Sequence, residues 1–407
     1  MSRSGSAWGE RGARVSAPVC GWITEGTLST TSLVLILILG VTYVGYPLLI
    51  AALASLRRLR PPRGGTWPSV SIIVPCHNEA AVIERKVRDC LAQVGPDEPV
   101  EVLVGCDGCT DNTAELARRV DDPRVRVFES PERLGKSAVM AECVQIANGD
   151  ILLFTDADAV MRPGSVKQLV RWFADPRVGV VSGAVKYTGA DGSHCGRGEQ
   201  VYWTLEGKLR EATGGAGWLL GACGPLFAIR RACYRPMGEG RGDDFELGMA
   251  ARLTGYLAVY EPEASVTTSY HPTGKSQFRR KVRIVSWFFR SGLVILGAAL
   301  RQRRFGVAAQ MLMQKILRWF SPAVALLLWA SLIADGGICM VLASTSLVLF
   351  LGASLRGYIT DRRGKAGGMC GFAYYIAVTT AAALVGVLKA ALPMPSRQLW
   401  DPGVQRR

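Results

Sequence analysis

Residues 149–158 read Gly-Asp-Ile-Leu-Leu-Phe-Thr-Asp-Ala-Asp, an apolar run that ends in two carboxylates. The uncharged segment Ile151–Thr155 predicts a short buried strand. Asp156 and Asp158 then emerge where the strand ends. Two carboxylates at this spacing can bind a hard divalent cation that also takes phosphate oxygens. The same spacing is common in solvated turns, so the meaning of the pair depends on its neighbours.

Strands and helices alternate upstream of this stretch. Three further strands are expected at Val70–Pro75, Val100–Gly105 and Val125–Phe128. The expected helices are 79–92, 111–120 and 137–147. This alternation predicts parallel βαβ units, an α/β fold. In such sheets ligands bind at the carboxyl ends of the strands.

Polar residues follow these strands in order. Pro75, Asn78 and Glu79 come at the end of the first strand, Asp107-Gly-Cys-Thr-Asp111 follows the second, and Gly135-Lys136 precedes the third helix. These residues could bind a ligand, but structural roles are also possible: Asp107 could form a turn before Gly108, and Asp111 could cap the next helix. Lys136 could equally be a solvated loop residue.

Two glycine-rich segments, 189–198 and 214–224, predict loops near a site. The second contains Gly221, Ala222, Cys223 and Gly224, and it leads into Leu226–Arg231. Further on, Asp243 and Asp244 are adjacent. Neighbouring carboxylates raise each other's proton affinity, which suits a general base, and acids at a helix start are also stabilised by the helix dipole.

This ordered string resembles the family 2 glycosyltransferases, which have a GT-A fold, a Rossmann-like mixed sheet with flanking helices. The family pattern V-P-x-x-N-E, D-G-S-T-D, G-K and G-D-x-x-x-x-x-D-A-D is matched in order over residues 70–158. The resemblance implies an inverting transfer from a nucleoside-diphosphate sugar, with a UDP-sugar expected, and a Mg²⁺ or Mn²⁺ cofactor. It also implies roles for individual residues: Asp158 and Asp156 at the metal; Pro75, Asn78, Glu79, Asp107, Lys136 and Asp156 at the donor; Gly221, Ala222, Cys223 and Gly224 at the acceptor; and Asp244 as base beside Asp243.

The final motif of the polysaccharide synthases in this family is Q-x-x-R-W. In the register that we choose, Arg283 matches its arginine and would stabilise the departing diphosphate. The glutamine and tryptophan are absent in that register, and Trp287 could substitute. Polysaccharide biosynthesis is therefore one expectation, and single-sugar addition to a membrane lipid is the alternative. A non-catalytic sensor or scaffold would be expected to lose the acids at the metal and base positions, and both pairs are present here. A transporter would be expected to carry charged or strongly polar groups within its spans, which the predicted spans lack.

Apolar segments frame this central domain. Residues 33–56 form an uncharged segment. This segment is longer than a bilayer-spanning helix requires and longer than a typical signal-peptide core. We expect a disordered tail at 1–30, a transmembrane helix at 31–57, the GT-A domain at 66–283, an interfacial segment at 284–304, three transmembrane helices within 316–392 and a tail at 393–407.

The formal charge is +15, from 48 Lys and Arg against 33 Asp and Glu. Basic residues gather beside the apolar runs, at 57–63 and 301–304, which favours membrane lipid over nucleic acid as the partner. This placement predicts an inner-membrane protein with a cytoplasmic catalytic domain that acts on a glycan or lipid-linked acceptor. Cys106-x-x-Cys109 has no second pair at zinc-ligand spacing, so the 11 cysteines are expected to be reduced thiols.

Overall fold

A computed structural model describes residues 27–62, 64, 66–188, 194–237, 241–269, 274–363 and 368–392 of the 407-residue chain. The predicted tail at 393–407 and all but the end of the tail at 1–30 lie outside the described residues. Residues 189–193 of the first glycine-rich segment also lie outside them. The prediction of a loop was wrong for residues 194–198, because these residues begin a helix, α7 (His194–Gly215).

The central α/β domain is built on one eight-stranded mixed sheet of order β3-β2-β1-β4-β7-β6-β8-β5. All four predicted strands are present and parallel, as β1 (Val70–Cys76), β2 (Val100–Asp107), β3 (Val125–Ser130) and β4 (Ile151–Thr155). The second half adds β5 (Val160–Met161), β6 (Val178–Thr188), β7 (Leu226–Arg230) and β8 (Leu257–Ser269), with β7 antiparallel to both β4 and β6. The fold is therefore the predicted mixed α/β sheet.

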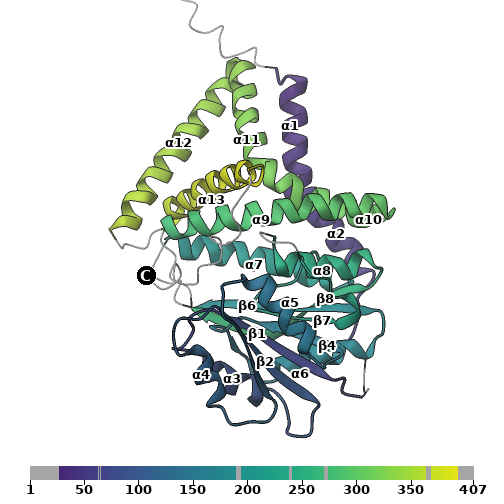
Figure 1. Ribbon diagram of the computed structural model, residues 1–407. Coiled ribbons are helices and arrows are strands. Elements are labelled where there is room, and N and C mark those ends of the chain that lie inside the picture. Colours follow the sequence, from purple (N-terminus) through teal and green to yellow (C-terminus); the bar gives the residue numbers. More distant parts are fainter. Residues whose placement is uncertain are drawn as a thin grey trace, which may run out of the picture.

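Helices pack on both faces of this sheet (Figure 1). The three predicted helices appear as α3 (Ile83–Ala92), α4 (Thr113–Arg118) and α5 (Lys136–Ile146). The remaining helices of this half are α6 (Ser165–Val170), η2 (Arg171–Ala174), α7, η4 (Arg231–Cys233) and α8 (Asp243–Leu253).

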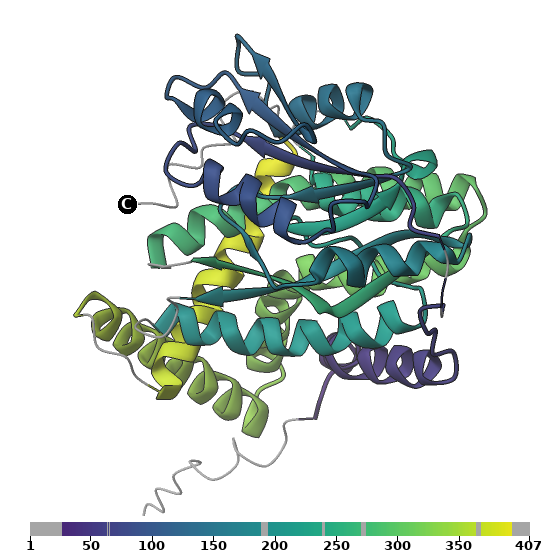
Figure 2. The same ribbon diagram turned by 90° about the horizontal axis from the view of Figure 1, so that it is seen from below.

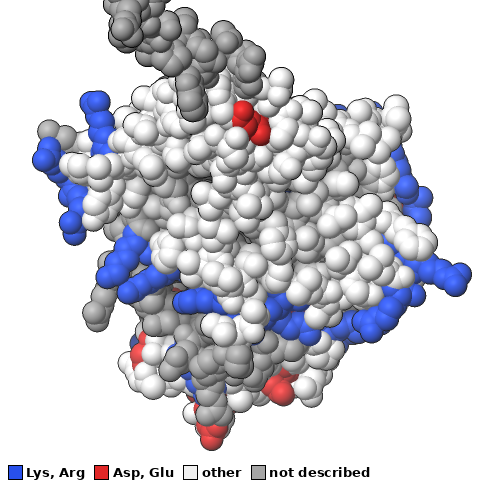
Figure 3. All heavy atoms as spheres, turned by 90° about the horizontal axis from the view of Figure 1, so that it is seen from above, with Lys and Arg blue, Asp and Glu red and all other residues white. Residues whose placement is uncertain are grey.

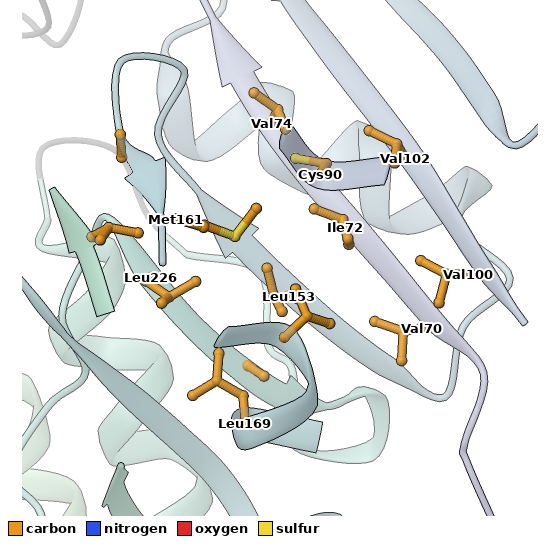
Figure 4. Close-up of a cluster of buried hydrophobic side chains, with 14 of the residues drawn as sticks. Val70, Ile72, Val74, Cys90, Val100, Val102, Leu153, Met161, Leu169 and Leu226 are labelled. Atoms are coloured by element: carbon orange, nitrogen blue, oxygen red, sulfur yellow. The ribbon is translucent and has the colours of Figure 1, made fainter. Parts of the chain in front are cut away.

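The two faces of β1 bury alternate side chains. Ile72 packs in one cluster with α3 residues such as Cys90 and with Leu169 of α6, as Figure 4 shows. Ile73 points to the opposite cluster with Met140 of α5. All seven residues of β1 are buried, because the sheet is covered on both sides.

Apolar helices lie at one end of the molecule (Figure 1). The first helix is α1 (Thr30–Gly40), continued through η1 (Val41–Gly45) and α2 (Tyr46–Ser55). The others are α9 (Gly274–Arg301), α10 (Phe305–Met311), η5 (Leu312–Ile316), α11 (Leu317–Ala334), α12 (Gly337–Arg362) and α13 (Gly368–Ala390). Among the described residues, five helical segments are long and apolar enough to cross a membrane: Thr30–Ser55, Lys275–Arg301, Phe305–Ala334, Gly337–Arg362 and Gly368–Ala390.

These helices do not all run in one direction. In Figure 1, α1 and α11 point away from the sheet, whereas α9 and α13 lie across them, and Figure 2 also shows α13 lengthwise. Ser29 and Ser32 before and within α1 donate hydrogen bonds to Asp335 after α11, so these two ends lie together far from the sheet. Figure 3 shows Lys and Arg side chains around the rim of the pale apolar face.

Candidate active site

The turn after β4 carries the two acids predicted to bind metal. Asp156 Oδ1 accepts a hydrogen bond from Lys136 Nζ at 2.8 Å. Asp158 Oδ2 accepts one from Thr268 Oγ1 of β8 at 3.2 Å. The two carboxylates thus stand between α5 and β8, at the carboxyl end of a parallel strand. Carboxylate oxygens in this arrangement suit Mg²⁺ or Mn²⁺.

Lys86 of α3 also holds this turn, and it was not predicted from the sequence. Its ammonium donates to Thr155 Oγ1 at 2.8 Å and to the Ala159 carbonyl at 2.6 Å, and its side chain is 1% exposed. The neighbouring Asp89 accepts a hydrogen bond from the Met161 amide. A signal was present in the sequence, since Lys86 lies on the apolar stripe of its helix. A charged residue at such a position is rarely buried unless it has partners.

Lys136, at the first position of α5, joins two parts of the site. Its Nζ lies 2.8 Å from Asp156 Oδ1 and 3.3 Å from Asp243 Oδ2. Burial alone would lower the pKa of Lys136, but the carboxylates of Asp156 and Asp243 outweigh burial and raise its pKa well above the ordinary value. Lys136 therefore stays charged and links the turn after β4 to the start of α8.

Asp244 is held against the predicted acceptor loop. Its Oδ2 accepts a hydrogen bond from the Gly224 amide at 3.0 Å, and its Oδ1 accepts one from its neighbour Phe245 at 2.8 Å. Burial, followed by the negative charge of Asp243, raises the pKa of Asp244 to about 7, although the Lys136 ammonium acts in the opposite direction. A carboxylate with this pKa is suited to accept a proton near neutral pH.

The acceptor loop itself is tightly packed. Gly221 has φ of +80°, and a Cβ there would lie 2.6 Å from the ring of Phe245. The Ala222 amide donates to the Asp244 carbonyl, and the Cys223 amide donates to Ser182 Oγ of β6. This loop is thus fixed to α8 and β6, and its backbone sets the position of the Asp244 carboxylate.

The loops after β1 and β2 hold each other. Asn78 has φ of +55°, and its side-chain oxygen accepts a hydrogen bond from the Thr110 amide at 2.8 Å. Asp111 accepts hydrogen bonds from the Thr113 amide at the start of α4 and from the Ala80 amide. Asp111 therefore bonds to the first residue of α4, whereas the N-cap position itself is Asn112, whose side chain makes no capping hydrogen bond. Pro75 is the penultimate residue of β1, just before this pair of loops. Glu79 is buried within the loops, and its amide donates to Thr113 Oγ1.

Asp107 is enclosed rather than open. Its side chain is fully buried, and its two oxygens accept hydrogen bonds from the amides of Leu134 and Gly135 at 2.6 to 3.1 Å. The carboxylate thus anchors the segment that leads into Lys136. A contact with a nucleotide base stays a prediction, and it would require this segment to move.

Helix α9 covers the start of α8. Phe288 stacks on Phe245 with ring centroids 5.1 Å apart, and Ser291 Oγ accepts a hydrogen bond from the Gly242 amide at 3.1 Å. Arg283, one turn earlier, lies over the ring of Trp287 at 5.5 Å. Its predicted contact with a diphosphate is not tested by these distances.

The same helix reveals a second register for the Q-x-x-R-W motif. Gln277 and Arg280 have the motif's glutamine-to-arginine spacing, which the register on Arg283 passed over, and Lys281 then occupies the place of the tryptophan. Gln277 is fully buried. Lys281 Nζ lies 3.1 Å from the Tyr375 hydroxyl of α13 and 5.3 Å from the centre of its ring. The glutamine is therefore present in the sequence, and the tryptophan remains absent from the motif.

Three thiols meet near the loops that follow β1 and β2. Cys76 of β1 joins the Cys106 and Cys109 pair, and the three sulfur atoms lie within 4.8 Å of one another. Only Cys106 and Cys109 are close in the sequence, and the pairing of β1 with β2 brings in the third thiol. The described cysteines are free thiols.

Comparison with known proteins agrees with this geometry. Residues 71–237 match the family described as glycosyl transferase family 2. The chain contains a family 2 glycosyltransferase domain. The match begins at β1, ends after η4 and includes both acids of the turn after β4.

Relatives of this glycosyltransferase domain include two N-acetylglucosaminyltransferases. One, from Mesorhizobium japonicum, is 26% identical over 58% of this chain and 59% of its own length. The other, from Rhizobium leguminosarum bv. viciae, is 27% identical over 56% of this chain and 58% of its own length. The chain thus spans less than two thirds of the length of these relatives.

A solved structure shares the fold. A mannosyltransferase from Pyrobaculum calidifontis, in complex with GDP-Man and Mn²⁺, aligns with a TM-score of 0.66 at 22% identity. The alignment covers 88% of this chain and 98% of that chain. Because residues 66–269 account for only half of the 407 residues, the likeness extends from the GT-A sheet into the apolar helices.

Proposed function

We propose that this chain is an inverting, metal-dependent glycosyltransferase that moves a sugar from a nucleoside-diphosphate sugar to an acceptor at the cytoplasmic face of the inner membrane. The observation that carries the proposal is the position of Lys136. Its ammonium contacts Asp156 of the metal-binding turn and Asp243 beside the base candidate. Donor and acceptor chemistry would therefore meet within one network of side chains.

Asp158 and Asp156 would hold Mg²⁺ or Mn²⁺, and the bound cation would neutralise the diphosphate of the donor. The mannosyltransferase with the same fold contains Mn²⁺ and GDP-Man. This supports a bound metal ion in the present chain but does not identify the nucleotide of its donor. We expect a UDP-sugar, because Asp107 matches the family's carboxylate that accepts a hydrogen bond from the nucleotide base, typically uracil. Two relatives of the domain are N-acetylglucosaminyltransferases, which favours an N-acetylglucosamine donor. Asp244 would take the proton of the acceptor hydroxyl as its oxygen attacks the anomeric carbon, and Lys136 would keep its charge beside the departing group.

The arrangement at the membrane supports the proposed location. Five apolar helical segments of the described residues gather at one end of the molecule, and basic side chains surround the apolar face (Figure 3). Basic flanks of this kind face the anionic cytoplasmic leaflet. The glycosyltransferase domain would then receive soluble donor from the cytoplasm and a glycan or lipid-linked acceptor from the membrane.

The test is release of nucleoside diphosphate by the purified full chain, with a panel of nucleotide sugars and Mn²⁺. Asp158→Ala and Asp244→Asn are each expected to lower the rate at least a hundredfold, because each removes a group that acts on the reacting centre. Asp97→Asn, at an exposed turn far along the chain from both motifs, is the matched control. Unchanged rates in both acid variants would contradict the proposal.

Single-sugar addition is the form of this activity that one observation favours. Lys281 stands where the polysaccharide synthases of this family have tryptophan, and it is engaged with Tyr375. Product size after incubation with labelled donor separates the two possibilities. One added sugar is expected, and a ladder of oligomers would instead indicate polymer synthesis.

A further inference from the structure

A buried charged group lies between the GT-A sheet and the apolar helices. We call it the Glu206 cluster, and it consists of Glu206 and Arg210 of α7, Lys315 of η5 and Arg318 of α11. Glu206 Oε2 lies 3.1 Å from Arg318 Nη1, and Oε1 lies 3.7 Å from Arg210 Nε and 3.8 Å from Lys315 Nζ. Three cations thus surround one carboxylate, and the cluster has a formal charge of +2.

The cluster is poorly solvated. The side chains of Glu206, Arg210 and Lys315 are 4%, 11% and 13% exposed. Burial would raise the pKa of Glu206, but Lys315, Arg210 and Arg318 together lower it to about 2, so the carboxylate is ionised. The Nε of Arg318 is buried and has no hydrogen-bond partner among the described residues. Excess buried positive charge is costly unless an anion compensates it.

The position of the cluster relates it to the membrane. Lys315 and Arg318 belong to the helical segment Phe305–Ala334, which is one of the segments apolar enough to cross a bilayer. Lys315 lies in its π-helical turn, η5, and such turns are frequent at functional sites. Ionisable residues in apolar helices are rare and mark substrate paths. Farther along α11, Leu326 and Leu327 are 51% and 59% exposed and offer a surface for a lipid tail.

The cluster also acts on the proposed base. The positive charge of Arg210 is one of the influences that lower the pKa of Asp244. Burial raises the pKa of Cys223 in the acceptor loop, and the charges of Arg210, Asp244, Asp156 and Glu206 also act on it. An anion at the cluster would therefore lie close to Asp244. The donor diphosphate is expected elsewhere, beside Asp156 and Asp158 at the end of β4.

We propose that the Glu206 cluster binds the phosphate group of a lipid-linked acceptor, an inference that rests on the proposed function. Two guanidinium groups and an ammonium match a phosphate in charge, and the arginine fork matches its oxygens in geometry. The lipid tail lies along the exposed side of α11. The phosphate anchors the acceptor, and a sugar hydroxyl attached to it reaches Asp244.

Direct binding tests this assignment without sugar transfer. The probes are geranylgeranyl phosphate, geranylgeraniol and inorganic phosphate, added to the detergent-purified full chain, with affinity measured by thermophoresis. We expect the prenyl phosphate to bind at least tenfold more tightly than either the prenyl alcohol or inorganic phosphate. Equal binding of the alcohol, effective competition by inorganic phosphate, or displacement by UDP would each overturn the proposal.

Substitutions in the cluster are expected to change the affinity for prenyl phosphate in opposite directions. Arg318→Gln is expected to weaken prenyl phosphate binding about tenfold or more, since one charged hydrogen bond is lost, and Arg318→Lys is expected to retain part of the affinity. Glu206→Gln removes the competing carboxylate and is expected to tighten binding, which a purely structural ion pair would not do. Arg301→Gln, an exposed arginine at the end of α9, is the control. Unchanged affinity in both Arg318→Gln and Glu206→Gln would contradict the inference.

The two proposals fail in different ways. If no nucleotide sugar is consumed by the wild-type chain, the proposed function fails whatever the lipid does. If sugar is transferred but prenyl phosphate binds no better than the alcohol, the function stands and the Glu206 cluster is only a structural ion-pair group.

Discussion

Asp244 accepts hydrogen bonds from the amides of Gly224 and Phe245, and it lies beside a second carboxylate. The two amides stabilise the ionised form, whereas burial and Asp243 stabilise the protonated form. Because the second influence is larger, the pKa rises to about 7. A base in this state is half protonated at neutral pH, so small changes around it alter the activity.

The first prediction concerns pH. With Asp244 as the base, log kcat/KM for transfer is expected to rise with slope about 1 below pH 7 and to level off above it, because only the ionised carboxylate accepts a proton. Asp243→Asn removes the neighbouring negative charge and should move the midpoint to lower pH. A pH–rate profile of both proteins checks this, and a midpoint that stays in place in Asp243→Asn would contradict the assignment.

The second prediction concerns Lys86, which holds the metal-binding turn. Lys86→Met removes the donor to Thr155 Oγ1 and to the Ala159 carbonyl, so both acceptors lose a buried partner. We expect Mn²⁺ affinity to fall about tenfold to a hundredfold, as for other groups that position metal ligands. The measurement is Mn²⁺ titration by isothermal calorimetry in the presence of UDP.

Arg88→Met on the same helix is the control for Lys86, since Arg88 is exposed and pairs only at the surface with Glu84. Surface ion pairs contribute little. Equal Mn²⁺ affinity in Lys86→Met and Arg88→Met would remove Lys86 from the supporting set.

At the scale of elements, the first half of the sheet was predictable and the second was not. The strand Ile151–Thr155 has the predicted ends, because a buried apolar run between Asp150 and Asp156 allows no other register. In contrast, β7 inserts between β4 and β6 as an antiparallel strand. Nothing local in Leu226–Arg230 encodes that order, since strand order depends on contacts distant in sequence.

The site shows the same division. Asp156, Asp158 and Lys136 were predicted from motifs, whereas Lys86 and the Glu206 cluster were not. Both escaped prediction because their partners come from distant segments: Lys86 pairs with the end of β4, and Glu206 pairs with residues more than a hundred positions away. A sequence motif identifies only residues that are close along the chain, and it does not show which distant residues they contact.

The third prediction concerns the contact between α13 and α9. A Cβ at Gly386 would lie 2.8 Å from Val285 Cβ and 3.1 Å from the Val282 carbonyl, so a larger residue must push the helices apart. Overpacking of this kind costs about 1–3 kcal/mol. Because α9 also holds Gly242 through Ser291, Gly386→Val is expected to lower the transfer rate several-fold as well as the melting temperature.

Gly352→Val on α12 is the control for Gly386, because a Cβ at Gly352 meets nothing within 4 Å. Activity and melting temperature of the two variants are compared in the same detergent. If Gly386→Val lowers the melting temperature but leaves the transfer rate unchanged, the contact between α13 and α9 does not affect the position of α8.

At the scale of the whole molecule, the direction of α13 decides the topology. The sequence predicted one span before the catalytic domain and three after it, which would put residue 392 on the side opposite the domain. In Figures 1 and 2, α13 lies lengthwise along α9 rather than beside α1. Its Gly386 packs on Val285, and Lys281 reaches Tyr375, so contacts hold α13 against the domain.

The fourth prediction follows from this arrangement. A protease-cleavable tag inserted after Leu392 is expected to be cut from the same side of the membrane as one inserted after Arg57, which precedes the catalytic domain. A tag inserted after Gly336 should be cut only from the other side, because Asp335 is joined to Ser29 and Ser32 far from the sheet. Protease added to right-side-out and inside-out vesicles gives the comparison. Cleavage after Leu392 on the Gly336 side would mean that α13 crosses the membrane, which would restore the four-span topology and require α13 to leave its contact with α9.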